Sequence, residues 1–293
     1  MNARPIGMFD SGFGGLTVAR AVIDLLPNEN LVYIGDTARY PYGPKPAADV
    51  REYAIEIANS LVNDFDAKMI VVACNTAASV ALSDLQSRLQ VPVIGVVEPG
   101  ARALVRVTKN KKVGVIGTTG TINSRAYDDA VAQVSGKTSP QVSGKTSPQV
   151  SDSTSHATSA SVDLTTRACP GFVEFVERNE TSGEEITKLA ETLLAPVRQA
   201  GVDALLLGCT HYPYLSDVIG KVMGQNVILV NSAEETAVAV RDALGASASS
   251  RSVGSGEKVV HEFFSSGDVQ QFAELGRRFL GPELSVAKLW QSK

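Results

Sequence analysis

Two cysteines carry the chemistry that this sequence suggests, because each follows a run of apolar residues and precedes small polar ones. Cys74 ends the run that begins at Met69, and Cys209 ends the run that begins at Ala204. Such runs are typical of buried parallel strands, whose carboxyl ends are where ligands bind in open α/β sheets. A helix start after each thiol would favour the thiolate, the reactive form. We therefore interpret the two thiols as a matched pair, one from each half of the chain.

Polar residues that follow predicted strands supply further groups at the same edge. His211 lies two residues beyond Cys209, where its imidazole could act as an acid or a base. Asp10 ends the first predicted strand, where a carboxylate can cap a helix or assist a base. The remaining candidates are hydroxyl and amide side chains: Ser11, Asn75, Thr76, Thr210 and the turn from Thr118 to Thr121.

Composition excludes several classes of protein. The chain has 293 residues, of which 44% are hydrophobic and 20% charged, so a packed core is expected. The net charge is −4 and no basic cluster is present, so nucleic acid is not an expected ligand. No run approaches the roughly 20 apolar residues of a membrane span, and we expect a cytoplasmic protein without a signal peptide.

Cysteine and glycine patterns argue against disulfides, metals and cofactors. Three cysteines are too few and too scattered for a disulfide framework, which favours a reducing compartment. Cys169 stands in a plain Ala-Cys-Pro-Gly-Phe context and is interpreted as a small buried apolar residue. No Cys-x-x-Cys pair suggests a metal, and the turn from Ser11 to Gly15 does not fit the dinucleotide pattern Gly-x-Gly-x-x-Gly. We therefore expect neither a metal nor a cofactor.

Alternating strand and helix patterns predict an α/β fold with mostly parallel sheets. Apolar runs bounded by turn residues predict the strands, and apolar residues at helical spacing predict the helices between them. The predicted strands cover residues 5–10, 31–35, 68–73, 91–96, 111–117, 204–207, 227–230 and 259–264, and the predicted helices cover residues 16–26, 47–65, 77–89 and 184–199.

One segment departs from this alternation. Residues 134–141 read VSGKTSPQ, residues 142–149 repeat them, and Ser/Thr-rich sequence continues to about residue 161. A period of eight is too short for a solenoid, so we predict a flexible surface insertion around residues 134–161. Its Gly-Lys-Thr lacks the upstream glycine and the preceding strand of a phosphate-binding loop. Residues 245–256 form a second low-complexity stretch and are predicted to be a loop.

Two thiols without a cofactor motif suit the removal and return of a proton at one carbon from opposite faces. One thiolate would take the proton, and the other thiol would deliver one on the far side. A carbon next to a carboxylate is a weak acid, so preorganised donors must stabilise the carbanion-like transition state. The symmetry of this task matches the symmetry of the two predicted half-sites.

Five segments together resemble the cofactor-independent aspartate/glutamate racemase family, and within it the glutamate racemases. The match is specific as a set, since the segments follow in the family's order from Asp10 to Pro213. They are DSGFGGLTV from Asp10, GD from Gly35, PYG from Pro41, ACNTA from Ala73 and GCTHYP from Gly208.

The resemblance implies two pseudo-symmetric α/β domains with the active site in the cleft between them. Residues 1–97 and 208–265 would form the first domain, residues 98–207 the second, and residues 266–293 a C-terminal helical segment. It further implies interconversion of L- and D-glutamate, which supplies D-glutamate for peptidoglycan, by an enzyme that is often a homodimer. Some family members are reported to inhibit DNA gyrase, which nothing in these residues tests.

The resemblance also assigns roles to individual residues. Cys74 would take the α-proton from D-glutamate with the assistance of Asp10, and Cys209 would take it from L-glutamate with the assistance of His211. Glu177, eight residues after Cys169, is a further acidic candidate. Substrate contacts would come from Asp10, Ser11, Tyr42, Gly43, Asn75, Thr76, Thr210 and His211, with Thr118 and Thr121 nearby.

Other interpretations remain open at this point. An aspartate or hydantoin racemase would use the same two thiols. A thiol hydrolase would use Cys209 as nucleophile and His211 as base and would leave Cys74 idle. Cys74, Cys209 and His211 could instead bind a metal, and a non-catalytic amino-acid binder is a further alternative.

Overall fold

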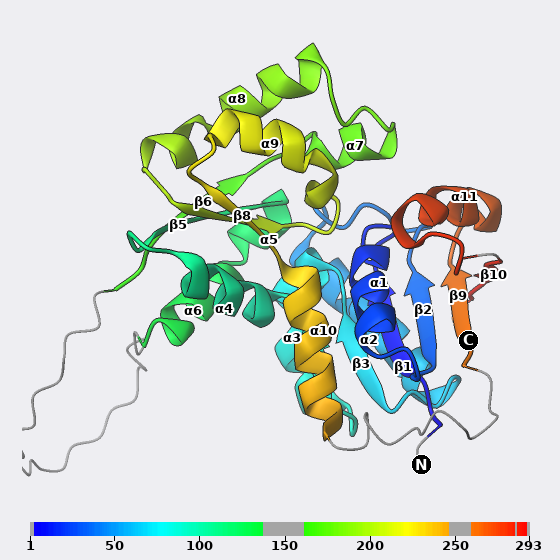
Figure 1. Ribbon diagram of the computed structural model, residues 1–293. Helices are drawn as coiled ribbons and strands as arrows, with labels where there is room; N and C mark the ends of the chain where they lie inside the picture. The colour runs from blue at the N-terminus through cyan, green and yellow to red at the C-terminus, as the bar shows by residue number, and fades with distance from the viewer. Residues whose placement is uncertain (1–2, 137–160, 246–258, 285, 292–293) are drawn as a thin grey trace, which may run out of the picture.

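The computed structural model describes residues 3–136, 161–245, 259–284 and 286–291, which form two α/β lobes (Figure 1). Every strand pairing in both sheets is parallel. The predicted α/β fold class is therefore confirmed. The insertion predicted around residues 134–161 lies outside the described residues from residue 137 to residue 160. Residues 246–256 of the second predicted loop also lie outside them.

The first lobe is built on a six-stranded sheet with the order β10-β9-β2-β1-β3-β4. Its central strands are buried at every residue, as expected where helices pack on a parallel sheet. The strands are β1 (Ile6–Asp10), β2 (Leu31–Gly35), β3 (Met69–Val72), β4 (Val93–Gly95), β9 (His261–Ser265) and β10 (Lys288–Leu289). The helices are α1 (Leu16–Leu25), α2 (Ala47–Asn63), α3 (Asn75–Arg88), α10 (Ser232–Leu244) and α11 (Val269–Leu280).

The second lobe is built on a four-stranded sheet with the order β6-β5-β7-β8. Helix α8 packs on β6, and α4 packs on β7 and β8. The strands are β5 (Lys112–Gly117), β6 (Asp163–Ala168), β7 (Ala204–Gly208) and β8 (Ile228–Asn231). The helices are α4 (Val97–Val107), α5 (Thr119–Asn123), α6 (Ala126–Val134), α7 (Phe172–Glu177), α8 (Glu184–Gln199), the 3₁₀ turn η1 (Tyr212–Leu215) and α9 (Ser216–Met223).

The chain passes into the second lobe between β4 and β5 and returns after β8. Helix α10 packs against both α1 and α4, so the two passages lie together (Figure 1). One apolar core extends from the first lobe to one face of the second sheet, where it includes Val115 and Leu206. A second core fills the other face, where Leu205 and Leu207 alternate with Leu206. The lobes are thus joined by packing as well as by the chain.

Strand pairing corrects the expected chain segments. Residues 208–265 were assigned to the first lobe, but β8 pairs with β7 in the second sheet, so the return falls after Asn231. Residues 266–293 were expected to form a C-terminal helical segment, which α11 confirms for residues 269–280, but β10 pairs with β9 and extends the first sheet. Strands β6 and β10 were not predicted at all. In the part of the chain that the structure describes, no helix has the length and apolar character needed to span a membrane.

Asp203, immediately before β7, anchors the connection between α4 and β5. Its Oδ2 accepts the backbone N–H groups of Lys109 and Asn110, both at 2.7 Å, and its Oδ1 accepts the Thr108 hydroxyl at 2.5 Å. Burial alone would raise the pKa of Asp203, but these hydrogen bonds lower it below the usual value. The carboxylate form is therefore favoured by folding.

Replacing Asp203 with Ala should lower the free energy of unfolding by about 1 kcal/mol at neutral pH, a value reduced for the solvent exposure of this carboxylate. Because the folded pKa is depressed, the stabilisation is present above the unfolded pKa of about 3.9 and is lost as pH falls through the folded pKa. Denaturant unfolding at several pH values measures the difference. Glu191→Ala, an exposed carboxylate on α8, is the matched control, and an equal effect of both substitutions would contradict the anchoring role.

Candidate active site

Cys74 lies between β3 and α3 and is the N-terminal cap of that helix. Its Sγ accepts the backbone N–H of Ala77 at 3.5 Å, and its thiol donates to Ser11 Oγ at 3.7 Å. Burial, followed by the negative charge of Asp10, raises the pKa of Cys74 to about 12, although both hydrogen bonds oppose the shift. The expectation that the helix start would favour a thiolate here is wrong, because burial and the carboxylate outweigh one N–H group. Cys74 is a thiol at neutral pH.

Cys209 directly follows β7 and has the opposite electrostatic surroundings. Its Sγ lies 4.0 Å from Nδ1 of His211, and Nε2 of His211 lies 3.6 Å from Oε1 of Glu177. Burial alone would lower the pKa of His211, but its interactions with Cys209 and Glu177 outweigh burial and raise it to about 10. The imidazole is therefore protonated at neutral pH, and an adjacent imidazolium favours the thiolate form of cysteine.

Both thiols line one small cavity between the lobes, as their matched positions predicted. The cavity has a volume of about 20 Å³, room for about one water molecule. This is far less than the volume of an amino acid, so any larger ligand requires the walls to separate. The lining residues are Asp10, Ser11, Tyr40, Pro41, Tyr42, Gly43, Cys74, Asn75, Thr76, Thr118, Val173, Cys209, Thr210 and His211.

Two predicted residues, Thr121 and Glu177, support the cavity without lining it. Thr121 Oγ1 lies 3.0 Å from the Thr118 hydroxyl and 3.3 Å from the Thr76 hydroxyl, so three hydroxyls form one cluster. Glu177 contacts the far side of His211. Tyr40, Pro41 and Val173 line the cavity but were not predicted. Pro41 belongs to the PYG segment that carries the resemblance, and no pattern in the sequence singled out Tyr40 or Val173.

Asp10 has a structural contact as well as an electrostatic one. Its buried Oδ2 accepts the backbone N–H groups of Gly12 at 3.1 Å and Gly15 at 3.0 Å, which holds the turn between β1 and α1. The same carboxylate charge acts on Cys74. Asp10 therefore both holds the turn between β1 and α1 and favours the protonated form of the Cys74 thiol.

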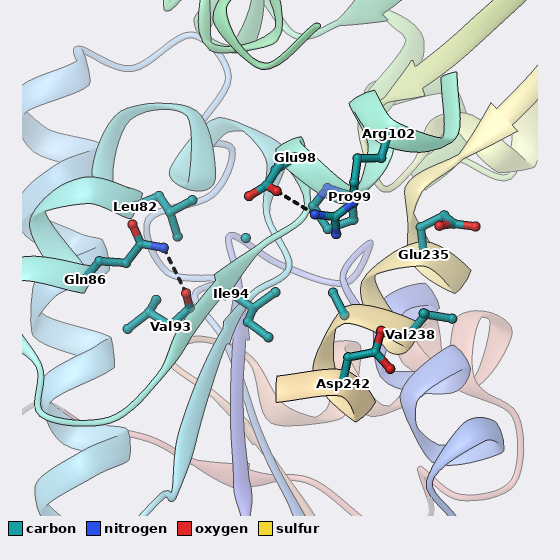
Figure 2. Close-up of a pocket in the computed structure, with 12 residues that line it drawn as sticks. Leu82, Gln86, Val93, Ile94, Glu98, Pro99, Arg102, Glu235, Val238 and Asp242 are labelled. Atoms are coloured by element: carbon teal, nitrogen blue, oxygen red, sulfur yellow. Dashed lines mark hydrogen bonds and ion pairs between the residues drawn. The ribbon is translucent and has the colours of Figure 1, made fainter. Parts of the chain in front are cut away.

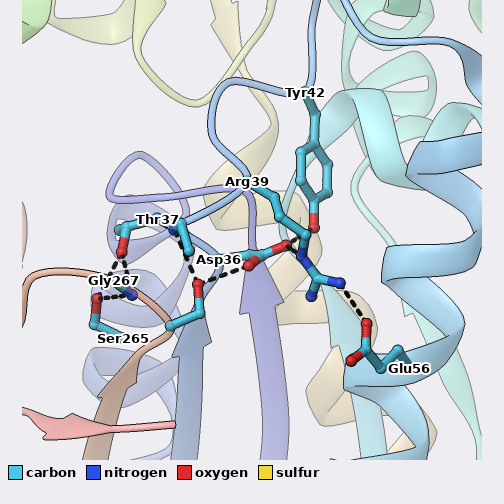
Figure 3. A network of polar contacts seen from close by, with 9 residues as sticks. Asp36, Thr37, Arg39, Tyr42, Glu56, Ser265 and Gly267 are labelled. Carbon is cyan, nitrogen blue, oxygen red and sulfur yellow. Dashed lines mark hydrogen bonds and ion pairs between the residues drawn. The ribbon is translucent and has the colours of Figure 1, made fainter. Parts of the chain in front are cut away.

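Tyr42 lines the cavity without offering its hydroxyl to it. The hydroxyl donates to buried Asp36, which also accepts from Nε of Arg39 at 2.7 Å and from the hydroxyl of Ser266 at 2.7 Å (Figure 3). Burial and the Asp36 charge raise the pKa of Tyr42, so its hydroxyl stays protonated. Arg39 also bonds Glu56 on α2. This network holds the loop that carries Tyr42 and Gly43, so these residues meet the cavity through ring and backbone.

The lobes approach closely at glycines around the cavity. The N–H of Gly120 donates to the carbonyl of Gly43 at 2.9 Å, which joins a loop of each lobe. A Cβ atom on Gly14 would lie 2.2 Å from Oγ1 of Thr210 and 2.6 Å from Nδ1 of His211. A side chain at position 14 would therefore push the Cys209 half-site away from the first lobe.

Other candidate sites lie outside the cysteine cavity. Cys169 is buried in the second core, and burial raises its pKa to about 12, as expected for a packing residue. A larger pocket of about 380 Å³ lies between α3, β4, α4 and α10 and shares no residue with the cysteine cavity (Figure 2). Its charged groups, Glu98, Arg102, Glu235 and Asp242, surround apolar side chains. Among the described residues, no three His, Cys, Asp or Glu side chains are grouped to hold a metal.

Comparison with known proteins defines the class of protein to which this site belongs. The Asp/Glu/Hydantoin racemase family matches residues 16–240. The chain therefore belongs to the Asp/Glu/Hydantoin racemase family.

Within that family, the chain is similar to several glutamate racemases. The chain is 48% identical over 285 residues to the glutamate racemase of Corynebacterium diphtheriae, with 97% of each chain covered. It is 46% identical over 294 residues to that of Parafrankia sp., covering 99% of this chain and 95% of the relative. Glutamate racemase isoform RacE1 from Bacillus anthracis has a TM-score of 0.81 at 35% identity, covering 100% of this chain and 98% of that one. Glutamate racemase from Thermus thermophilus, in complex with Beta-chloro-D-alanine, has a TM-score of 0.77 at 40% identity, with coverage of 99% and 96%.

The charge on His211 can be tested directly by NMR titration of its imidazole. Its resonances should keep the protonated shift through neutral pH and titrate near pH 10, whereas those of His261, whose pKa burial lowers, should titrate below 6.5. Cys209→Ala should lower the His211 pKa, because it removes an interaction that favours the imidazolium. His211→Gln assigns the signal. A His211 midpoint near 6.5 would refute the proposed charge pair.

Proposed function

We propose that this chain is a glutamate racemase, an isomerase that interconverts L- and D-glutamate by proton transfer through Cys74 and Cys209. The name of every relative described above supports the reaction. The observation that carries the mechanism is that both thiols line one cavity between the lobes, with Cys74 protonated and Cys209 beside the imidazolium of His211. A reaction with two bases requires this arrangement, because one group must accept a proton while the other holds one to donate.

The charges next to the two thiols make this protonation form of the enzyme ready to convert L-glutamate into D-glutamate. Cys209, paired with the imidazolium of His211, takes the α-proton of L-glutamate. Cys74, kept protonated by burial and Asp10, delivers its proton to the opposite face and gives D-glutamate. Afterwards Cys74 is the thiolate and Cys209 the thiol, which is the form that accepts D-glutamate. Proton exchange with solvent or the reverse reaction restores the first form.

Polar groups around the cavity are suited to the carboxylates of the substrate. The hydroxyl cluster of Thr76, Thr118 and Thr121 and the N-terminal end of α3 supply donors on the Cys74 side. Thr210 lies on the Cys209 side. Donors held in fixed positions around the cavity stabilise the negative charge that develops as the α-proton leaves. In this mechanism the side chains do all the chemistry, without a cofactor, and the D-glutamate formed serves peptidoglycan synthesis.

Proton NMR of L-glutamate in heavy water, with the pure enzyme and no added cofactor, tests the reaction. The α-proton signal should disappear while circular dichroism shows conversion to the racemic mixture. Aspartate and hydantoin substrates, assayed in parallel, separate this enzyme from the related racemases. Failure of a folded enzyme to exchange the α-proton of glutamate would exclude the proposed function.

Serine substitutions test the roles of the two thiols. Cys74→Ser and Cys209→Ser should each lower kcat by about 10²–10⁴-fold, because each removes one of two acid/base groups. Cys169→Ala, a buried thiol outside the cavity, is the matched control and should retain most of the activity. A thiol hydrolase that uses only Cys209 would instead keep its activity in Cys74→Ser.

A further inference from the structure

Three buried polar atoms in the Cys209 half-site lack a hydrogen-bond partner among the described residues. They are the hydroxyl of Tyr40, Oε1 of Glu177 and Nε2 of His211. Glu177 and His211 are within ion-pair distance, at 3.6 Å, but beyond hydrogen-bond contact. Buried polar atoms in proteins are nearly always hydrogen-bonded, and unsatisfied ones at an active site point to a functional contact. These three require a common explanation.

Tyr40 comes from the first lobe, whereas Glu177 and His211 come from the second. The loop after β2 places the Tyr40 ring 6.3 Å from the His211 ring, at an interplanar angle of 41°. Phe13, from the first lobe, packs edge-on against the Tyr40 ring, with the two centroids also 6.3 Å apart. Gly12 permits this packing, because a Cβ there would lie 2.9 Å from the Tyr40 ring. The ring is thus held by both lobes beside the cavity.

The surroundings of the Tyr40 hydroxyl make it a donor. Burial, then the charges of Glu177, Cys209 and Asp10, raise its pKa, so the hydroxyl stays protonated. Glu177 is the anionic group that acts on it most strongly. A protonated hydroxyl beside a carboxylate forms one of the stronger classes of hydrogen bond. Catalytic hydrogen bonds are commonly long without substrate and shorten in the substrate complex.

We propose that Tyr40 is a positioning residue for the Cys209 half-site, an inference that rests on the proposed two-thiol reaction. Its hydroxyl donates to the Glu177 carboxylate. The carboxylate, held from the first lobe, fixes His211 with Nε2 toward Glu177 and Nδ1 toward the sulfur of Cys209. Tyr40 of the first lobe thereby orients the groups beside Cys209, which belong to the second lobe. This contact exists only when the lobes are together.

Tyr40→Phe tests this role, because it keeps the ring and removes only the donor. Loss of a hydrogen bond to a charged group should lower kcat/KM by about 10-fold. The two glutamate enantiomers have equal free energy in water, so kcat/KM must fall equally in both directions. The specific readout is therefore the primary isotope effect, measured separately with L- and D-glutamate deuterated at the α-carbon.

The isotope effects report which thiol limits the reaction. Cys209 removes the label from L-glutamate and Cys74 removes it from D-glutamate. In Tyr40→Phe, the isotope effect on kcat/KM should rise for L-glutamate and fall toward 1 for D-glutamate, because transfer at Cys209 becomes limiting. Tyr53→Phe makes the same change outside the cavity, next to Tyr42, and should leave both isotope effects at the wild-type values.

Other outcomes would overturn the inference. A rise in KM with both isotope effects unchanged would assign the hydroxyl to the substrate rather than to Glu177. Wild-type kinetics in folded Tyr40→Phe would show that the hydroxyl has no role. In both cases the wild-type enzyme still racemises glutamate, whereas failure of the proposed function would appear as no α-proton exchange in the wild-type enzyme itself.

Discussion

Different charges next to the two buried thiols organise the whole cavity, because a carboxylate favours the protonated thiol and an imidazolium favours the thiolate. Asp10 faces Cys74, and the pair of His211 and Glu177 faces Cys209. Two like thiols in like surroundings would both be acids or both be bases, and neither state could remove one proton and deliver another. In the mechanism we propose, the charged partners therefore give two similar thiols different roles in proton transfer.

The parallel sheets make this arrangement possible, because they present every strand end on one edge. A cysteine follows strand β3 in the first sheet, after Ala73, and another directly follows β7 in the second, and the lobes face each other through these edges. Glycines at these sheet edges then determine how closely the two lobes approach each other. Gly14 lets the first lobe meet Thr210 and His211, and Gly43 meets Thr118 and Gly120. Packing between the lobes thus decides the distance across which a proton must pass.

Much of this architecture could be predicted, since it depends on short patterns. Apolar runs gave the central strands, and matched positions placed Cys74 and Cys209 in one cavity. Strand β6 escaped prediction because its Thr and Arg residues are only half-buried and lack a continuous apolar run. Strand β8 pairs with β7, the strand that precedes it in the chain, whereas the domain bounds that the resemblance implied placed it in the other lobe. The protonated state of Cys74 depends on burial and on Asp10, which is 64 positions earlier in the sequence. Tyr40 lies beside the cavity because of a loop conformation, which no periodic pattern in the sequence indicates.

Closure and protonation are two aspects of one event in this molecule. Burial is the largest cause of the raised pKa of Cys74, and the cavity of about 20 Å³ is what buries it. Separation of the walls, which any amino acid needs in order to enter, would hydrate the thiol and weaken that cause. In the mechanism we propose, the lobes must then close around the substrate before Cys74 is again a thiol that can donate its proton. The step that excludes water would therefore also restore the acid role of Cys74, which couples binding of the substrate to readiness for proton transfer.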